Sequence, residues 1–140
     1  MQTLESLKLV PVYLLFLGTF GQASLEKFLS GGVPDWFVKQ FEKTKFNCFP
    51  GALTLQYYSI AALEALVVLA FVLSAGSFEF VAGHDKSILK AALVLALFTF
   101  WALGFGLRVG GDFQGAANLF MYFGVTLLIL AYVERFANVS

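Results

Sequence analysis

Four long apolar stretches constrain the fold of this chain more than any other feature of its sequence. They cover residues 9–29, 53–74, 88–109 and 116–133, and each is close to the roughly 20 residues that a helix needs to cross the hydrocarbon core of a bilayer. An isolated strand would leave its backbone groups unpaired in lipid, and a barrel strand has only about 9 to 11 residues. The sequence therefore predicts an all-α membrane protein built as a four-transmembrane-helix bundle.

The composition agrees with this class and excludes others. Hydrophobic residues make up 59% of the 140 residues and charged residues 13%, whereas soluble domains average about 45–50% and 25%. The formal net charge is +0, so the chain offers neither a basic face for nucleic acid nor an acidic field that steers a substrate. We expect one integral membrane domain over residues 1–140 and no nucleic-acid partner.

The first apolar stretch begins close enough to Met1 to suggest a secretory signal. It lacks the short apolar core and the small-residue exit that are typical of a cleavage site. We therefore predict a retained first helix. Four crossings place both termini on one side of the membrane, but the basic residues are divided too evenly to say which side that is.

The link between the first two stretches, residues 30–52, is the longest in the chain. Pro34 suits a first helical position and Asp35 a place near a helix N-terminus, so we predict a short helix over 34–43. Its apolar side chains follow one stripe while its charges lie elsewhere, which is typical of a helix at the membrane interface. The stripe consists of Trp36, Phe37, Gln40 and Phe41.

The other two links are short. Residues 75–87 include Glu79, His84, Asp85 and Lys86 and indicate a surface loop. Residues 110–115 predict a tight, glycine-assisted turn between antiparallel spans. Nearby, Gly106-x-x-x-Gly110 indicates close helix packing rather than a phosphate loop, because no Gly-Lys-Ser/Thr follows it.

Glu64 is the most informative polar residue, because it lies near the middle of the second stretch. A carboxylate there costs about 2.5 to 3.5 kcal/mol on insertion scales. At a rise of about 1.5 Å per residue, Glu64 lies about 16 Å from the membrane side that bears the link at residues 30–52. The other spans place polar side chains at a similar depth or closer to that side. We predict a polar centre or ligand site formed by Glu64, Gln22, Thr99, Tyr122, Thr126 and Asn118.

Each part of this predicted centre has an alternative role. Glu64 could instead be a protonated acid that hydrogen-bonds a neighbouring helix, and each threonine could bond only its own backbone. Lys27 and Arg108 are expected at the mouth of the pocket, where they could bind an anionic head group of a ligand or reach the lipid phosphates. We also expect the polar faces of the second and fourth spans to meet inside the bundle.

No motif in the sequence assigns a catalytic residue, a metal site or a cofactor. His84 is the single histidine and Cys48 the single cysteine. They cannot supply a metal-ligand set, an intramolecular disulfide or a thiol redox pair. The sequence therefore leaves enzymatic activity undecided and favours a non-catalytic protein.

Three short segments carry a family resemblance. They are Ala23-Ser24-Leu25-Glu26-Lys27-Phe28, Pro34-Asp35-Trp36-Phe37-Val38-Lys39-Gln40-Phe41 and Ile60-Ala61-Ala62-Leu63-Glu64. Together with the order of the spans, they resemble the DoxX-like family of small four-span bacterial membrane proteins over most of the chain. Lys27 and Glu64 are the most family-like positions.

The resemblance implies a multi-pass protein of the bacterial inner membrane that is associated with redox complexes or quinone-linked oxidation. Relatives that support thiol oxidation often carry cysteine pairs, which Cys48 alone cannot provide. Our leading hypothesis is a non-catalytic membrane component of a redox or respiratory assembly, with a polar site that holds a lipid or a quinone. Its expected partners are membrane lipids, a membrane protein or larger complex, and a quinone. The alternative is a small transporter or quinone-linked oxidoreductase that uses Glu64 as a proton carrier.

Overall fold

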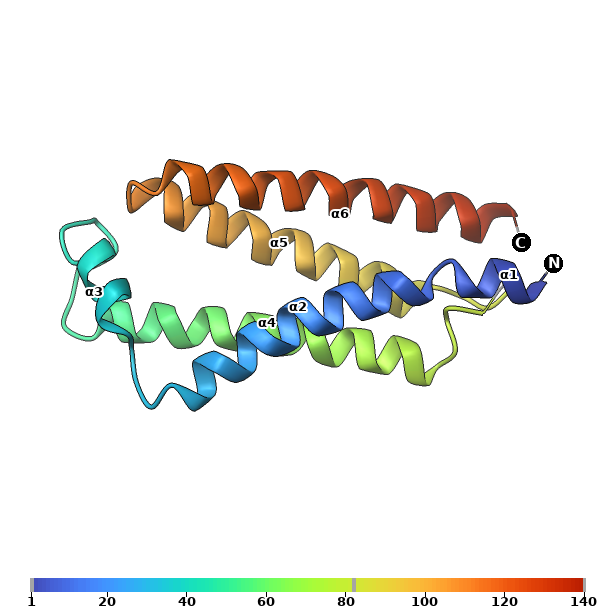
Figure 1. The fold of residues 1–140 in the computed structure, drawn as a ribbon, viewed down its shortest axis with the longest axis horizontal. Coiled ribbons are helices and arrows are strands. Elements are labelled where there is room, and N and C mark those ends of the chain that lie inside the picture. The colour runs from blue at the N-terminus through green and yellow to red at the C-terminus, as the bar shows by residue number, and fades with distance from the viewer. Residues whose placement is uncertain (1, 82, 140) are drawn as a thin grey trace.

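The computed structural model describes residues 2–81 and 83–139, so Met1, Ala82 and Ser140 of the predicted domain lie outside the described residues. Every regular element within these ranges is a helix (Figure 1). In chain order they are α1 (Gln2–Leu7), α2 (Val10–Leu29), α3 (Asp35–Phe41), α4 (Ala52–Gly76), α5 (Ser87–Val109) and α6 (Phe113–Val139). The predicted all-α class and the short helix in the first link are confirmed.

Within residues 2–81 and 83–139, four helical segments are long and apolar enough to cross a membrane. They are Thr3–Leu29, Ala52–Gly76, Ser87–Val109 and Phe113–Arg135. The first combines α1 and α2, which are separated just before Pro11, a residue without the N–H that a continuous helix would use. These segments identify a multi-pass membrane protein, as the sequence predicts.

The long helices pack in a defined order. α2 crosses α4 diagonally, α4 also packs against α5, and α5 pairs with α6 along an antiparallel hairpin (Figure 1). The expectation that the second and fourth spans meet face to face is wrong, because α4 and α6 do not pack closely against each other in the described residues, and α5 packs against both. The start of α1 and the end of α6 lie at the same end of the bundle (Figure 1), as four crossings require.

Most of the buried apolar side chains form one core between α2, α4 and α5. Aromatic rings dominate it: Phe16 stacks on Phe71 with 4.9 Å between ring centroids, and Phe20 lies 5.0 Å from Phe100. Such ring contacts stabilise a bundle by packing, since lipid removes the usual hydrophobic drive between helices. The core therefore holds α2, α4 and α5 together, and Val133 of α6 belongs to it as well.

A second, smaller cluster fixes α3 to the start of α4. Phe37 and Phe41 are 7% and 5% exposed and pack with Leu53 and Tyr57. Trp36, which the sequence places on the same stripe, is 60% exposed. The stripe therefore divides between two environments, and half of it anchors α3 to the protein itself.

The glycines near the α5–α6 turn have different roles. Gly111 has a φ of +85°, which allows the chain to reverse. A Cβ on Gly110 would lie 2.8 Å from the Phe41 ring, so this glycine permits the close approach of α3. A Cβ on Gly106 would meet nothing within 4 Å. The two glycines of Gly106-x-x-x-Gly110 therefore do not form one helix-packing surface.

Candidate functional site

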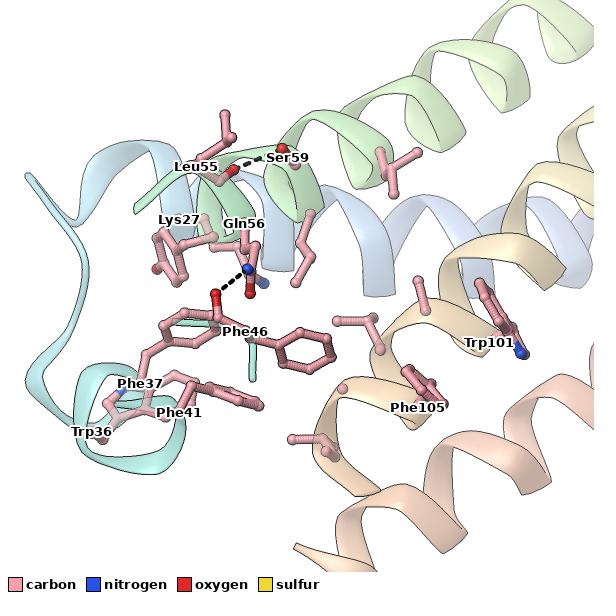
Figure 2. A pocket seen from close by; sticks show the side chains of 17 residues that line it. Lys27, Trp36, Phe37, Phe41, Phe46, Leu55, Gln56, Ser59, Trp101 and Phe105 are labelled. Atoms are coloured by element: carbon pink, nitrogen blue, oxygen red, sulfur yellow. Dashed lines mark hydrogen bonds between the residues drawn. The ribbon is translucent and has the colours of Figure 1, made fainter. Parts of the chain in front are cut away.

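An apolar cavity of about 620 Å³ lies between α3, α4 and α5, within the range typical of small-molecule sites (Figure 2). Its position follows from the fold, because α4 and α5 diverge toward the end of the bundle that α3 covers (Figure 1). Gly106 of α5 lines it and adds no side chain. Aromatic side chains supply much of the wall: Trp36, Phe37, Phe41, Phe46, Tyr57, Trp101 and Phe105.

Lys27 is the one charged residue that lines this cavity in the described part of the chain, and it pairs with Glu64. Its Nζ donates to both carboxylate oxygens of Glu64, at 3.2 Å to Oε1 and 3.0 Å to Oε2. Glu64 is 2% exposed, and the Lys27 side chain is 21% exposed. Because an unpaired charge is costly in a membrane, this ion pair offsets the burial of both groups.

The pair joins two residues that the sequence places at different depths. Lys27 is near the end of α2, and Glu64 is near the middle of α4. The diagonal crossing of α2 over α4 brings these two levels within reach of the long lysine side chain (Figure 1). Glu64 of the predicted polar centre and Lys27 of its predicted mouth therefore form a single site.

Tyr57 adds an unusual polar group to the cavity wall. It is 3% exposed and lines the cavity, yet its hydroxyl makes no hydrogen bond to any residue in 2–81 or 83–139. Every fully inaccessible side-chain nitrogen or oxygen in those ranges has a hydrogen-bond partner. The Tyr57 oxygen therefore keeps accessible surface, and its donor and acceptor capacity remains available.

Gln56 closes one side of the cavity by joining α4 to the long link. Its Nε2 donates to the Phe46 carbonyl at 2.7 Å (Figure 2). This bond holds the Phe46 ring over the cavity, with the Phe41 ring 5.9 Å away. The aromatic wall on this side is therefore fixed by hydrogen bonding as well as by packing.

The buried threonines of the predicted centre bond their own helices. Thr99 is 0% exposed and donates to the Leu95 carbonyl at 2.9 Å. Thr126 is 1% exposed and donates to the Tyr122 carbonyl at 2.7 Å. Both hydroxyls are satisfied in this way, so neither is needed by Glu64.

The other predicted residues also lie apart from Glu64. Gln22 is exposed and donates to Glu26, while Asn118 accepts a bond from Gln114. Arg108, predicted at the mouth, is exposed and lies 4.6 Å above the Phe113 ring. Tyr122 is 51% exposed and borders a separate cavity of about 300 Å³ between α2 and α6, together with Thr126, Thr19 and Phe100.

A second polar network, which we call the loop-end network, lies at the opposite end of the bundle. Glu79 is 4% exposed and accepts bonds from Ser74 Oγ at 2.6 Å and from the backbone N–H groups of Ile88 and Leu89. The Tyr13 hydroxyl is 2.6 Å from Ser74 Oγ. One carboxylate therefore joins α2, α4 and the N-terminus of α5.

Lys86 completes the loop-end network. It is 0% exposed, and its ammonium donates to the carbonyls of Glu79, Val81 and His84 at 2.8, 3.1 and 3.0 Å. Burial lowers the pKa of Lys86, while the negative charges of Glu79 and Asp85 oppose that shift. The expectation of a simple surface loop is wrong for Glu79 and Lys86, because both are buried and their charged groups are hydrogen-bonded within the protein, Glu79 by Ser74 and two backbone N–H groups and Lys86 by three carbonyls.

The described residues contain no group of three His, Cys, Asp or Glu side chains that could hold a metal ion. Comparisons with protein-family models, with characterised proteins and with solved structures gave no match. The functional argument therefore depends on the geometry of the cavity and its polar wall.

Proposed function

We propose that this protein is a DoxX-like, non-catalytic membrane component of a redox or respiratory assembly that holds a lipid or a quinone in the cavity between α3, α4 and α5. The observation that carries the binding role is the apolar cavity of about 620 Å³ whose wall includes the Lys27 end of a buried ion pair. Sites for small molecules combine apolar walls with a few fixed polar groups in this way.

The redox association is supported by the resemblance of residues 23–28, 34–41 and 60–64 to DoxX-like proteins. A bacterial inner-membrane location follows from the same resemblance. The cavity adds a physical reason for a membrane-soluble ligand, because its wall is mostly apolar and it lies between helices long enough to span a bilayer.

The binding role is tested by purifying the protein in mild detergent and identifying the small molecules and proteins that accompany it by mass spectrometry. Gly106→Leu fills the cavity at a position where a Cβ meets nothing within 4 Å. Gly18→Leu is the matched control. Gly18 is exposed, a Cβ on it also meets nothing within 4 Å, and it does not line the cavity.

We expect an amphiphile to accompany the wild type and Gly18→Leu but not Gly106→Leu. A stoichiometric membrane-protein partner supports the assembly role. The same set of bound molecules in all three proteins would contradict the binding role, and purification as a chain with no protein partner would contradict the assembly role.

A second candidate function follows from the Lys27–Glu64 contact. A carboxylate and an ammonium within 3.0 Å in the bilayer can exchange a proton, so Glu64 could carry protons in a small transporter or quinone-linked oxidoreductase. Glu64→Gln keeps the size and one oxygen acceptor but cannot carry a proton. Solute transport or quinone turnover that is present in the wild type and lost in a stably folded Glu64→Gln variant would favour this candidate.

A further inference from the structure

The Tyr57 side chain is buried in the cavity wall, and its hydroxyl, which keeps some accessible surface, has no hydrogen-bond partner among the described residues. Its neighbourhood is apolar, and a hydroxyl transferred from water to such surroundings without a hydrogen bond is unfavourable. The matching tyrosine at the other end of the bundle, Tyr13, has a partner in Ser74 at 2.6 Å. An oxygen atom on a ligand in the cavity would give Tyr57 the partner that it lacks.

Lys27 supplies a second donor to the same cavity. An ammonium group carries three N–H bonds, and two contacts to the Glu64 oxygens leave one for a ligand. Glu64 itself does not line the cavity, so a ligand meets the donor while Glu64 balances the charge behind it. An anion at Lys27 would also approach the Glu64 carboxylate and be repelled, which favours a neutral ligand.

Aromatic rings in the cavity wall offer stacking contacts to a flat ring of a ligand. Trp101 and Phe105 of α5 are stacked, with 5.9 Å between their ring centroids, and both line the cavity (Figure 2). Phe46 lies 6.3 Å from Phe105 in an edge-on arrangement. A planar ring gains offset-stacked and edge contacts from such a set, while a saturated acyl chain gains only area.

We propose that the cavity recognises a neutral amphiphile with a single oxygen-bearing ring, whose ring oxygen is bound by the Tyr57 hydroxyl and the Lys27 ammonium. This inference rests on the proposed function, since it names the class of ligand for the same cavity. It adds that the oxygen of the ring, and not its apolar tail alone, determines the affinity.

The chain provides its own probe for this ligand. Its two tryptophans, Trp36 and Trp101, both line the cavity. Binding of a decyl-substituted benzoquinone to the purified full-length protein can therefore be measured by quenching of tryptophan fluorescence. Decylbenzene, which lacks the ring oxygens, and dodecanoate, which carries a charge, serve as competitors in the same titration.

The test compares Tyr57→Phe with Tyr58→Phe. Tyr58 is the next residue along α4, is half-buried, and does not line the cavity. Removing the Tyr57 hydroxyl should weaken benzoquinone binding by about two- to tenfold, the effect of one neutral hydrogen bond, and leave competition by decylbenzene unchanged. Tyr58→Phe should bind both molecules as the wild type does.

Two results would overturn the inference while the proposed function stands. One is unchanged benzoquinone affinity in Tyr57→Phe together with loss of binding in Gly106→Leu. The other is tighter binding of dodecanoate than of benzoquinone, which would identify an anion site. If benzoquinone quenches the wild type and Gly106→Leu equally and no competitor has an effect, the cavity binds no amphiphile, and the proposed function fails with the inference.

Discussion

The loop-end network and the cavity site each contain a carboxylate, a lysine and a tyrosine, but they use them differently. At the loop end, Glu79 accepts three hydrogen bonds and the Tyr13 hydroxyl is bonded to Ser74. At the cavity end, the hydrogen bonds to Glu64 from the described residues all come from Lys27, and the Tyr57 hydroxyl has no partner there. The loop-end network is complete, whereas the cavity site keeps free hydrogen-bonding capacity.

This difference bears on two roles that a polar group in a membrane bundle can have, stabilising the fold and binding a ligand. A complete network stabilises the chain, because every donor and acceptor that leaves water finds a fixed partner. An incomplete one beside a cavity costs stability and is consistent with a ligand that supplies the missing partner. The comparison therefore predicts that substitutions at the loop end act on folding, while those at the cavity end act on binding.

The largest expected effect is that of Glu79→Ala. This change leaves the Ser74 hydroxyl and the N–H groups of Ile88 and Leu89 without their acceptor, and we expect the free energy of unfolding to fall by about 3 to 5 kcal/mol. Denaturant titration in detergent measures this loss of unfolding free energy. The control is Glu5→Ala, which removes only a solvent-exposed ion pair with Lys8 and should leave stability nearly unchanged. Equal losses in the two variants would contradict a structural role for the loop-end network.

The next effect separates the two glycines of Gly106-x-x-x-Gly110. Gly110→Ala would force its Cβ against Phe41, which is itself packed, and should cost about 1 to 3 kcal/mol. Gly106→Ala places its Cβ in open space within a helix and should raise stability by about 0.5 to 1 kcal/mol. Thermal unfolding followed by circular dichroism compares the pair. Similar shifts of the same sign would mean that both glycines serve helix packing.

A double-mutant cycle measures the strength of the Lys27–Glu64 pair. We expect Lys27→Met and Glu64→Leu to be coupled by about 1 to 2 kcal/mol of unfolding free energy, because each single change leaves the other polar group unpaired in the bundle. The exposed Gln22–Glu26 contact is the control and should show coupling of about 0.5 kcal/mol or less. Additive effects of the two substitutions would mean that the ion pair does not hold α2 to α4.

The smallest stability effect should distinguish the two buried tyrosines. Tyr13→Phe removes a hydroxyl that is bonded to Ser74 and should cost about 1 kcal/mol. Tyr57→Phe removes a hydroxyl without a partner in the described residues, so stability should stay within about 0.5 kcal/mol of the wild type. Denaturant titrations of both variants and of the wild type measure these changes in the free energy of unfolding. A large loss in Tyr57→Phe would show that its hydroxyl has a structural partner.

The sequence predicts the helices well because length and apolarity are local properties. The predicted 34–43 helix is observed as Asp35–Phe41, and the predicted spans fall within α2, α4, α5 and α6, apart from residue 9. The main differences are at the ends. α6 continues to Val139, beyond the predicted residue 133, because a helix need not stop where its apolar stretch stops.

The site is less predictable because it depends on the direction in which each side chain points from its helix. The rise per residue gives the depth of Thr99 and Thr126 in the membrane. It cannot show that their hydroxyls donate to carbonyls of their own helices. The same rise per residue separates Lys27 from Glu64, since it ignores the crossing of α2 over α4 and the reach of a lysine. The cavity itself arises from the divergence of α4 and α5, which no local pattern in the sequence records.

The ion pair between α2 and α4 also has a consequence for insertion during synthesis. Lys27 enters the membrane first, close to the end of its helix, where a long side chain can reach the head groups. Glu64 follows in the middle of the next span, where a lone carboxylate costs about 2.5 to 3.5 kcal/mol. Because Lys27 is already present, the later helix meets its counter-charge as it enters the bilayer. A chain that begins after α2 should therefore insert α4 less efficiently than the full chain does.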